Sequence, residues 1–112
     1  MDTYGKWNEE VKAVLAVACI SDGFEATERN LIETLTEADV FFKETVGTHR
    51  WWNDELRVVK IGDNYIGYLW ANSTGDTSLS DLGWEFDLSS AKFYEPKEVV
   101  QVIFVPKEIG NV

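Results

Sequence analysis

Apolar residues in the first half of the chain recur every three or four positions, which is the spacing of one face of an α-helix. They predict a helix from about Lys6 to Ile20, ended by the polar turn 21–23. The predicted buried stripe consists of Trp7, Val11, Val14, Leu15 and Ala18. Cys19 lies at the end of this apolar segment, and we expect its thiol to be buried and inert.

A second helical pattern predicts a helix from about Glu25 to Glu44. Its predicted apolar stripe consists of Leu31, Leu35, Ala38 and Phe42. Thr27 is a candidate N-cap for this helix. Alternatively, Thr36 and Asp39 form a capping box that splits the segment into two shorter helices.

After Gly47 the hydrophobic period becomes two, which is typical of half-buried strands. The pattern predicts a hairpin with strands at about 56–61 and 65–71 around the turn Gly62-Asp63-Asn64. An exposed loop is expected over 72–82. Further strands are predicted at 84–86, 92–94 and 99–105, with a turn at 87–90 between the first two.

Helices followed by strands predict an α+β domain. We expect a single domain over 1–112, with a helical region at 1–46 packed on one face of a four- or five-stranded antiparallel sheet at 47–112. The alternative is a helical extension on a small SH3-like barrel at 50–105. A chain of 112 residues with 45% hydrophobic content has enough apolar side chains for one core.

The charge balance narrows the function classes. Twenty acidic and ten basic residues give a formal charge of −10, which repels phosphate backbones and anionic membranes, so general nucleic-acid binding is not expected. The longest apolar stretch, Ala13–Ile20, is too short to span a membrane and lacks the flanks of a signal peptide. A single cysteine fits a reducing compartment. We therefore expect a soluble, cytoplasmic protein.

Candidate catalytic and metal-binding chemistry is sparse. The chain has one histidine, His49, and no motif for nucleophilic catalysis or phosphate binding. His49 with Asp54 and Glu55 matches no zinc spacing, and the acidic residues of 76–87 lack the spacing of a calcium loop. We therefore expect no enzyme activity, no cofactor and no metal site.

Acidic residues concentrate in two segments. Positions 21–42 carry six acids and one base, and positions 72–91 carry four acids and no base. The candidate partner-binding carboxylates are Glu25, Glu28, Glu33, Glu37, Asp39, Asp76, Asp81, Glu85 and Asp87. Adjacent residues of an extended segment point to opposite faces, so we expect either Trp51 or Trp52 to be exposed and to anchor an interface.

Residues 48–106 resemble small accessory proteins of bacteriophages and mobile elements. The resemblance rests on the His49-Arg50-Trp51-Trp52 start, the hairpin from Ile61 to Tyr68, and the run from Thr74-Gly75-Asp76 to Gly83-Trp84-Glu85-Phe86-Asp87. It implies a short phage product that acts in the host cytoplasm, a class that includes anti-CRISPR and anti-restriction inhibitors.

Charge and resemblance together lead to two functional hypotheses. The first is a non-enzymatic inhibitor that mimics DNA and occupies the basic nucleic-acid-binding surface of a host nuclease or defence complex. The second is a structural or assembly component of a virion or mobile element, held together by aromatic and strand-edge contacts. Mimicry predicts binding that salt weakens, whereas the assembly hypothesis predicts association that is insensitive to salt.

Overall fold

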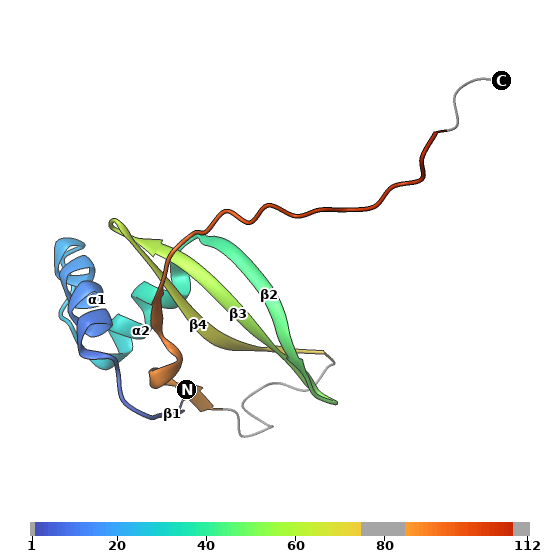
Figure 1. Cartoon of the computed structure of the whole chain (residues 1–112). Helices are drawn as coiled ribbons and strands as arrows, with labels where there is room; N and C mark the ends of the chain where they lie inside the picture. The colour runs from blue at the N-terminus through green and yellow to red at the C-terminus, as the bar shows by residue number, and fades with distance from the viewer. Residues whose placement is uncertain (1, 75–84, 109–112) are drawn as a thin grey trace.

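The computed structural model describes residues 2–74 and 85–108. Their elements follow the order β1 (Asp2–Tyr4), α1 (Glu9–Ser21), α2 (Glu28–Glu37), β2 (Val40–Thr48), β3 (Trp52–Ile61), β4 (Asn64–Ser73), β5 (Glu85–Asp87), the 3-10 turn η1 (Leu88–Ser90) and β6 (Lys92–Tyr94) (Figure 1). The predicted α+β class with N-terminal helices is confirmed. The four-stranded antiparallel sheet has the order β2-β3-β4-β6 and is open, not a closed barrel, within the described residues.

Helix α1 begins where Asn8 caps its first turn. The Asn8 side chain accepts hydrogen bonds from the backbone N–H groups of Glu10 and Val11, at 2.9 and 3.2 Å. The helix ends before Gly23, whose φ of +86° lies in the left-handed region that favours glycine. Its buried side chains are Val11, Leu15 and Cys19, which confirms the buried thiol and the centre of the predicted stripe. Val14 and Ala18 are partly buried, and Trp7 packs into the core from before the helix.

Helix α2 is shorter than predicted. Thr27 caps it as expected, but the backbone of Ala38 is already extended, so the prediction of a helix to Glu44 is wrong, and so is the capping-box alternative. Residues 40–48 instead form β2, because aromatic and β-branched side chains suit a strand paired with β3. Phe42 is consequently 52% exposed and not in the helical core. The region 1–46, which was expected to be helical, therefore also contains β1 and most of β2.

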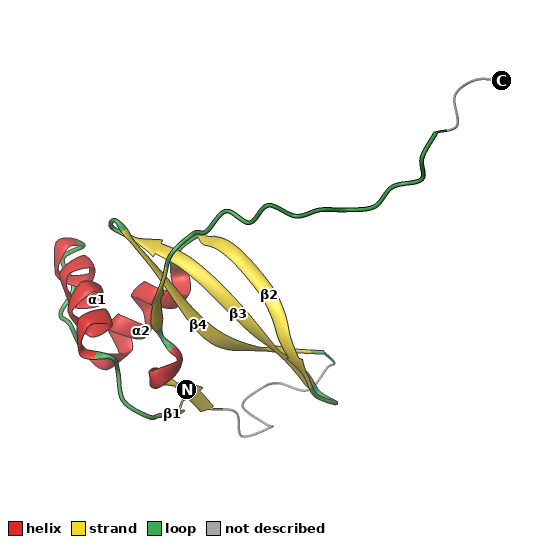
Figure 2. Ribbon diagram, in the orientation of Figure 1, coloured by secondary structure: helices red, strands yellow, loops and turns green. Residues whose placement is uncertain are grey.

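The predicted hairpin is confirmed as β3 and β4, and the strand order places it at the centre of the sheet. Its turn contains Gly62 at φ +61°, and its register sets Val59 opposite Ile66. Both side chains are fully buried in one core with Leu15 and Leu35 of the helices. Figure 2 shows that the helices lie on one side of this sheet. The opposite side of the sheet is uncovered by helices.

A short parallel pair, β1 with β5, lies outside the main sheet and was not predicted. Thr3 faces Phe86, whose ring is completely buried. The predicted strand at 84–86 is shifted to Glu85–Asp87, and Trp84 lies outside the described residues. The predicted strand Lys92–Tyr94 is confirmed as β6, paired with β4.

The predicted strand at 99–105 is absent. Residues 95–108, which we name the C-terminal arm, have no regular structure and leave the folded body in an extended course (Figure 1). The Cα radius of gyration is 18.8 Å, whereas a compact domain of this length has about 13 Å. The segment has strand-forming residues, but a strand also needs a neighbouring strand to accept its backbone hydrogen bonds.

Candidate functional site

The sheet face that points away from the helices carries an apolar patch. Side chains alternate along β3, so Leu56 and Val58 lie on this face while Val59 packs against the helices. The register adds Phe42 of β2, which lies opposite Val58. The result is a groove of about 590 Å³, which we name the apolar groove. It is lined by Phe41, Phe42, Leu56, Val58, Tyr65, Tyr94, Glu95, Pro96 and Lys97.

Aromatic rings form much of this surface. Phe41 packs edge-on against Tyr65, with ring centroids 5.7 Å apart. The ring of Tyr94 lies against Gly67, where any Cβ would overlap it. Phe41 and Phe42 remain 63% and 52% exposed. An antiparallel sheet with one solvated face normally carries polar side chains there, so an exposed aromatic face indicates a binding surface.

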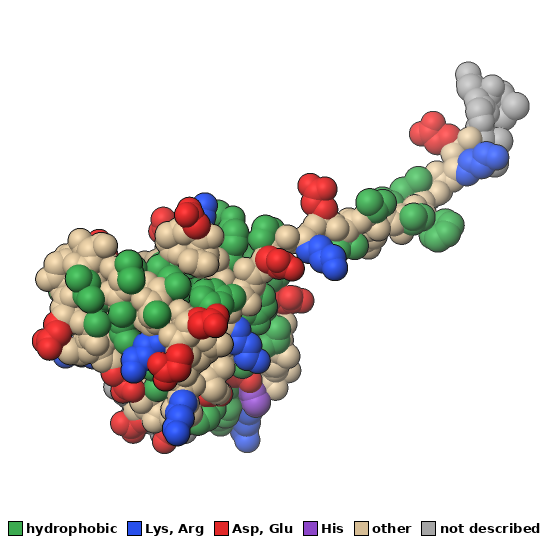
Figure 3. Space-filling model, turned by 60° about the vertical axis from the view of Figure 1, so that its left-hand side comes forward, with side chains coloured by type: hydrophobic (Ala, Val, Ile, Leu, Met, Phe, Trp, Pro, Cys, Tyr) green, Lys and Arg blue, Asp and Glu red, His purple; other side chains and the backbone are tan. Residues whose placement is uncertain are grey.

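The C-terminal arm is the second exposed apolar feature. Six of its side chains are between 69% and 97% exposed, and hydrophobic side chains line it in Figure 3. They are Val99, Val100, Val102, Ile103, Phe104 and Val105. An exposed segment this rich in apolar side chains is unusual on the surface of a soluble monomer and is typical of a segment that pairs with another chain.

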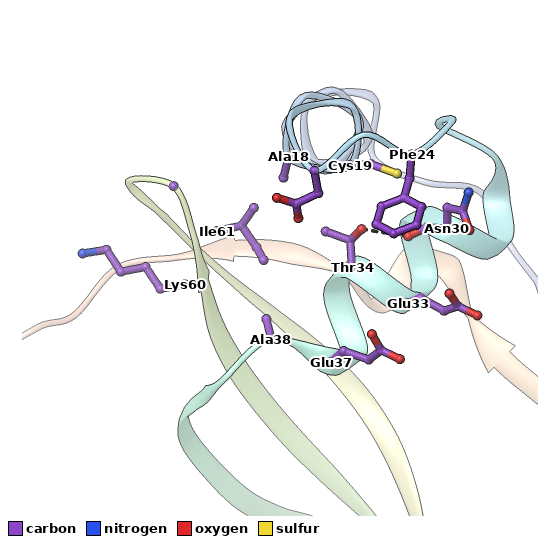
Figure 4. A pocket seen from close by; sticks show the side chains of 12 residues that line it. Ala18, Cys19, Phe24, Asn30, Glu33, Thr34, Glu37, Ala38, Lys60 and Ile61 are labelled. Carbon is purple, nitrogen blue, oxygen red and sulfur yellow. Dashed lines mark hydrogen bonds between the residues drawn. The ribbon is translucent and has the colours of Figure 1, made fainter.

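Most candidate carboxylates of the first acidic segment lie on or beside α2. Glu25 precedes the helix, and Asp39 follows it in the link to β2. Glu33 and Glu37 are one turn apart on α2 and line a groove of about 400 Å³ that also contacts the end of α1 and the β3–β4 turn (Figure 4). The carboxylate of Glu33 pairs with Arg29 at 3.2 Å on the exposed surface.

The structure links Glu28 to the second acidic segment. Its carboxylate accepts a hydrogen bond from the Thr3 hydroxyl at 3.3 Å, and Thr3 pairs with Phe86 between Glu85 and Asp87. The carboxylate of Asp87 caps η1 by accepting from the backbone N–H and the hydroxyl of Ser89, at 2.9 and 2.6 Å. Asp76 and Asp81 lie outside the described residues.

The two adjacent tryptophans differ in exposure. Trp51 is 42% exposed, and the Arg50 guanidinium lies 4.7 Å from its ring centre. Trp52 is half-buried, stacks on His49 with ring centroids 4.3 Å apart, and donates its indole N–H to Asp54 at 3.1 Å. Trp51 is therefore the more accessible of the two. His49 lies in the turn between β2 and β3, and its Nε2 atom contacts the same Asp54 carboxylate at 2.8 Å.

A buried polar cluster on the helix-facing side of the sheet was missed by the sequence reasoning. Glu55, only 8% exposed, accepts from Arg57 at 2.6 Å and from Asn72 at 2.7 Å, and Arg57 also donates to Asn72 at 3.0 Å. The alternation of side chains along the strand could have revealed this cluster. Glu55 and Arg57 lie at even spacing from the buried Val59, which assigns them to the same face. The cluster leaves the buried Tyr68 hydroxyl without a hydrogen-bond partner.

Burial raises the pKa of the Tyr68 hydroxyl above its ordinary value of 10.0. The Arg57 guanidinium opposes this increase, and the Glu55 carboxylate adds to it. Tyr68 therefore stays neutral at physiological pH.

Other site types are not formed among the residues that the structure describes. No three histidine, cysteine or acidic side chains come together there as metal ligands. Neither described helix has the length and apolar character that a membrane crossing requires. No protein-family model, curated protein or solved structure matches the chain.

Proposed function

We propose that this protein is a non-enzymatic association component that binds a protein partner through apolar strand contacts, as an assembly component of a virion or mobile element does. The observation that carries the proposal is that one chain presents two exposed apolar surfaces. One is the C-terminal arm, and the other is the apolar groove from whose rim the arm starts.

The energetics favour burial of the arm against a partner. Burying one Val, Ile or Phe side chain contributes about 1.5–3 kcal/mol, while fixing one residue of backbone costs about 1–2 kcal/mol. The net gain for each docked residue is therefore small, and it is positive only where the partner surface fits closely. Because the arm carries six exposed apolar side chains, a closely fitting partner surface can bury several of them at once. This arrangement supports association through strand pairing.

The experiment replaces two arm side chains in the full chain, Val102→Asp with Phe104→Asp. Both side chains are at least 79% exposed, so the fold does not depend on them. Association measured by sedimentation is expected to disappear in this double variant. The unmodified chain is expected to remain associated from about 0.1 M to about 1 M salt. Over this range the Debye length falls from about 10 Å to about 3 Å.

The matched control is Val17→Asp, the same substitution at a 68% exposed position on α1. It is expected to leave association unchanged. Equal loss in the control, or an arm variant that associates like the original chain, contradicts the proposal.

A second function, DNA mimicry toward a basic surface, is favoured by one specific observation. Glu25, Glu37, Asp39 and Glu85 are exposed, and none has an ion-pair partner among the described residues. Together with the net charge of −10, they support binding to a cationic groove of a nucleic-acid-handling enzyme.

The test is capture of partners from host lysate with elution by a salt gradient. Mimicry predicts a nuclease or DNA-binding complex that releases at moderate salt. It also predicts that the variant with Glu25→Gln, Glu33→Gln, Glu37→Gln and Asp39→Asn loses both affinity and salt dependence. Partners that salt does not release, with unchanged affinity in the amide variant, contradict mimicry.

A further inference from the structure

We propose that the apolar groove is filled by the C-terminal arm of a second copy of this chain, and that the two copies exchange arms reciprocally. This inference rests on the proposed association function and names its partner. The arm and the groove are present in every copy. Each groove is completed only when another arm enters it.

The arm cannot easily return to its own groove. Glu95, Pro96 and Lys97 form part of the groove's rim, and from there the arm runs away from the sheet (Figure 1). A return would need a tight turn, and the turn-forming residues of 95–108 are limited to Pro96 and Pro106, with no glycine, asparagine or aspartate. The β-branched run that begins at Val99 also favours extended backbone. An extended arm therefore reaches beyond its own groove.

The position of the arm's root favours a symmetric dimer. Because the arm starts at the groove, a two-fold axis beside the root places each arm across the other copy's groove. The same contacts then form twice. This doubling strengthens the dimer, because a stable interface buries about 1,200–2,000 Å² in total and each arm contributes part of that area.

The charges of the arm and the unpaired edge of β2 are compatible with the arm of a second copy as the occupant of the groove. Two copies of a chain with net charge −10 repel each other, but positions 99–106 carry no charge. The arm's charged residues lie at its two ends, where Lys97 neighbours Glu98 and Lys107 neighbours Glu108. Strand β2 pairs with β3 on one side only among the described residues, so its other edge offers main-chain hydrogen bonds to an incoming strand.

Two full-length variants and their mixture test the exchange. The arm variant combines Val102→Asp and Phe104→Asp, and the groove variant is Phe42→Asp, at a position that is 52% exposed. Each variant alone is expected to sediment as a monomer of 12.8 kDa, whereas the unmodified chain sediments at twice this mass. The mixture regains association, weaker than that of the unmodified chain, because the intact arm of the groove variant enters the intact groove of the arm variant and restores one of the two contacts.

Thermal unfolding of each variant first establishes that it is folded. Two folded variants that stay monomeric on mixing overturn the exchange. An arm variant that remains dimeric overturns the exchange and the proposed association through the arm together. An unmodified chain that is monomeric at every concentration also overturns the exchange, and the association function then survives only if a different protein binds the same arm.

Discussion

At the scale of single residues, the polar cluster around Glu55 shows how the fold accommodates charge inside the sheet. The Glu55 carboxylate and the Arg57 guanidinium are mostly buried, and Asn72 bridges them. Their hydrogen bonds offset the cost of removing both charges from water. Tyr68 lies on the same face, and its hydroxyl is the buried group of this region that lacks a hydrogen-bond partner.

The raised pKa of Tyr68 leads to a stability prediction at alkaline pH. The unfolded chain loses this proton near pH 10.0, whereas the folded chain retains it to higher pH. The stabilisation is therefore complete below pH 10.0 and is lost as the pH rises above this value. In Tyr68→Phe, the decrease in the free energy of unfolding above pH 10.0 should be smaller, and stability at pH 7 should be unchanged or higher.

Chemical denaturation at a series of pH values measures both effects. The control is Tyr4→Phe, at a position that is 52% exposed, where the alkaline decrease should match that of the unmodified chain. If Tyr68→Phe lowers stability at pH 7 by more than about 1 kcal/mol, the hydroxyl has a favourable partner and the account of this site is wrong.

At the scale of elements, local signals identified the Thr27 cap and the hairpin, whereas the predicted helix starts at Lys6 and Glu25 were each three residues early. Asn8 and Thr27 cap their helices through side-chain hydrogen bonds that depend on a few neighbouring residues. The errors arose where pairing partners decide the structure. The spacing of Leu35 and Phe42 fits a helix, yet pairing with β3 makes residues 40–48 a strand. Residues 99–105 have strand composition but no partner strand among the described residues.

The cap of α2 is directly testable. The Thr27 hydroxyl accepts from the backbone N–H of Asn30 at 3.2 Å, so Thr27→Ala should lower the free energy of unfolding by about 0.5–2 kcal/mol. Thr34→Ala is the matched control inside the same helix. Its hydroxyl donates to the carbonyl of Asn30 at 2.8 Å, a contact that adds little to helix stability. Equal losses in the two variants, measured at one protein concentration, refute the capping role.

At the scale of the whole molecule, the folded body and the arm contribute different components of the candidate site. The sequence predicted an exposed tryptophan in the 51–52 pair, and it predicted a strand at 99–105 where the structure has the unpaired arm. It did not predict the apolar groove, because the groove depends on the register that sets Phe42 opposite Val58. It also did not show that the arm lacks a partner strand. The lack of a partner strand becomes evident only from the strand order of the described sheet.

The most direct test of the central claim is amide hydrogen exchange of the arm in the full chain, measured over a range of protein concentrations. If a protein partner covers the arm, the amides of Val99–Val105 become protected as the chain associates, and their exchange slows by more than about tenfold relative to the most dilute sample. If these amides exchange at the rate of an unstructured peptide at every concentration, and also when cell lysate is added, the arm has no partner and the proposed association is contradicted.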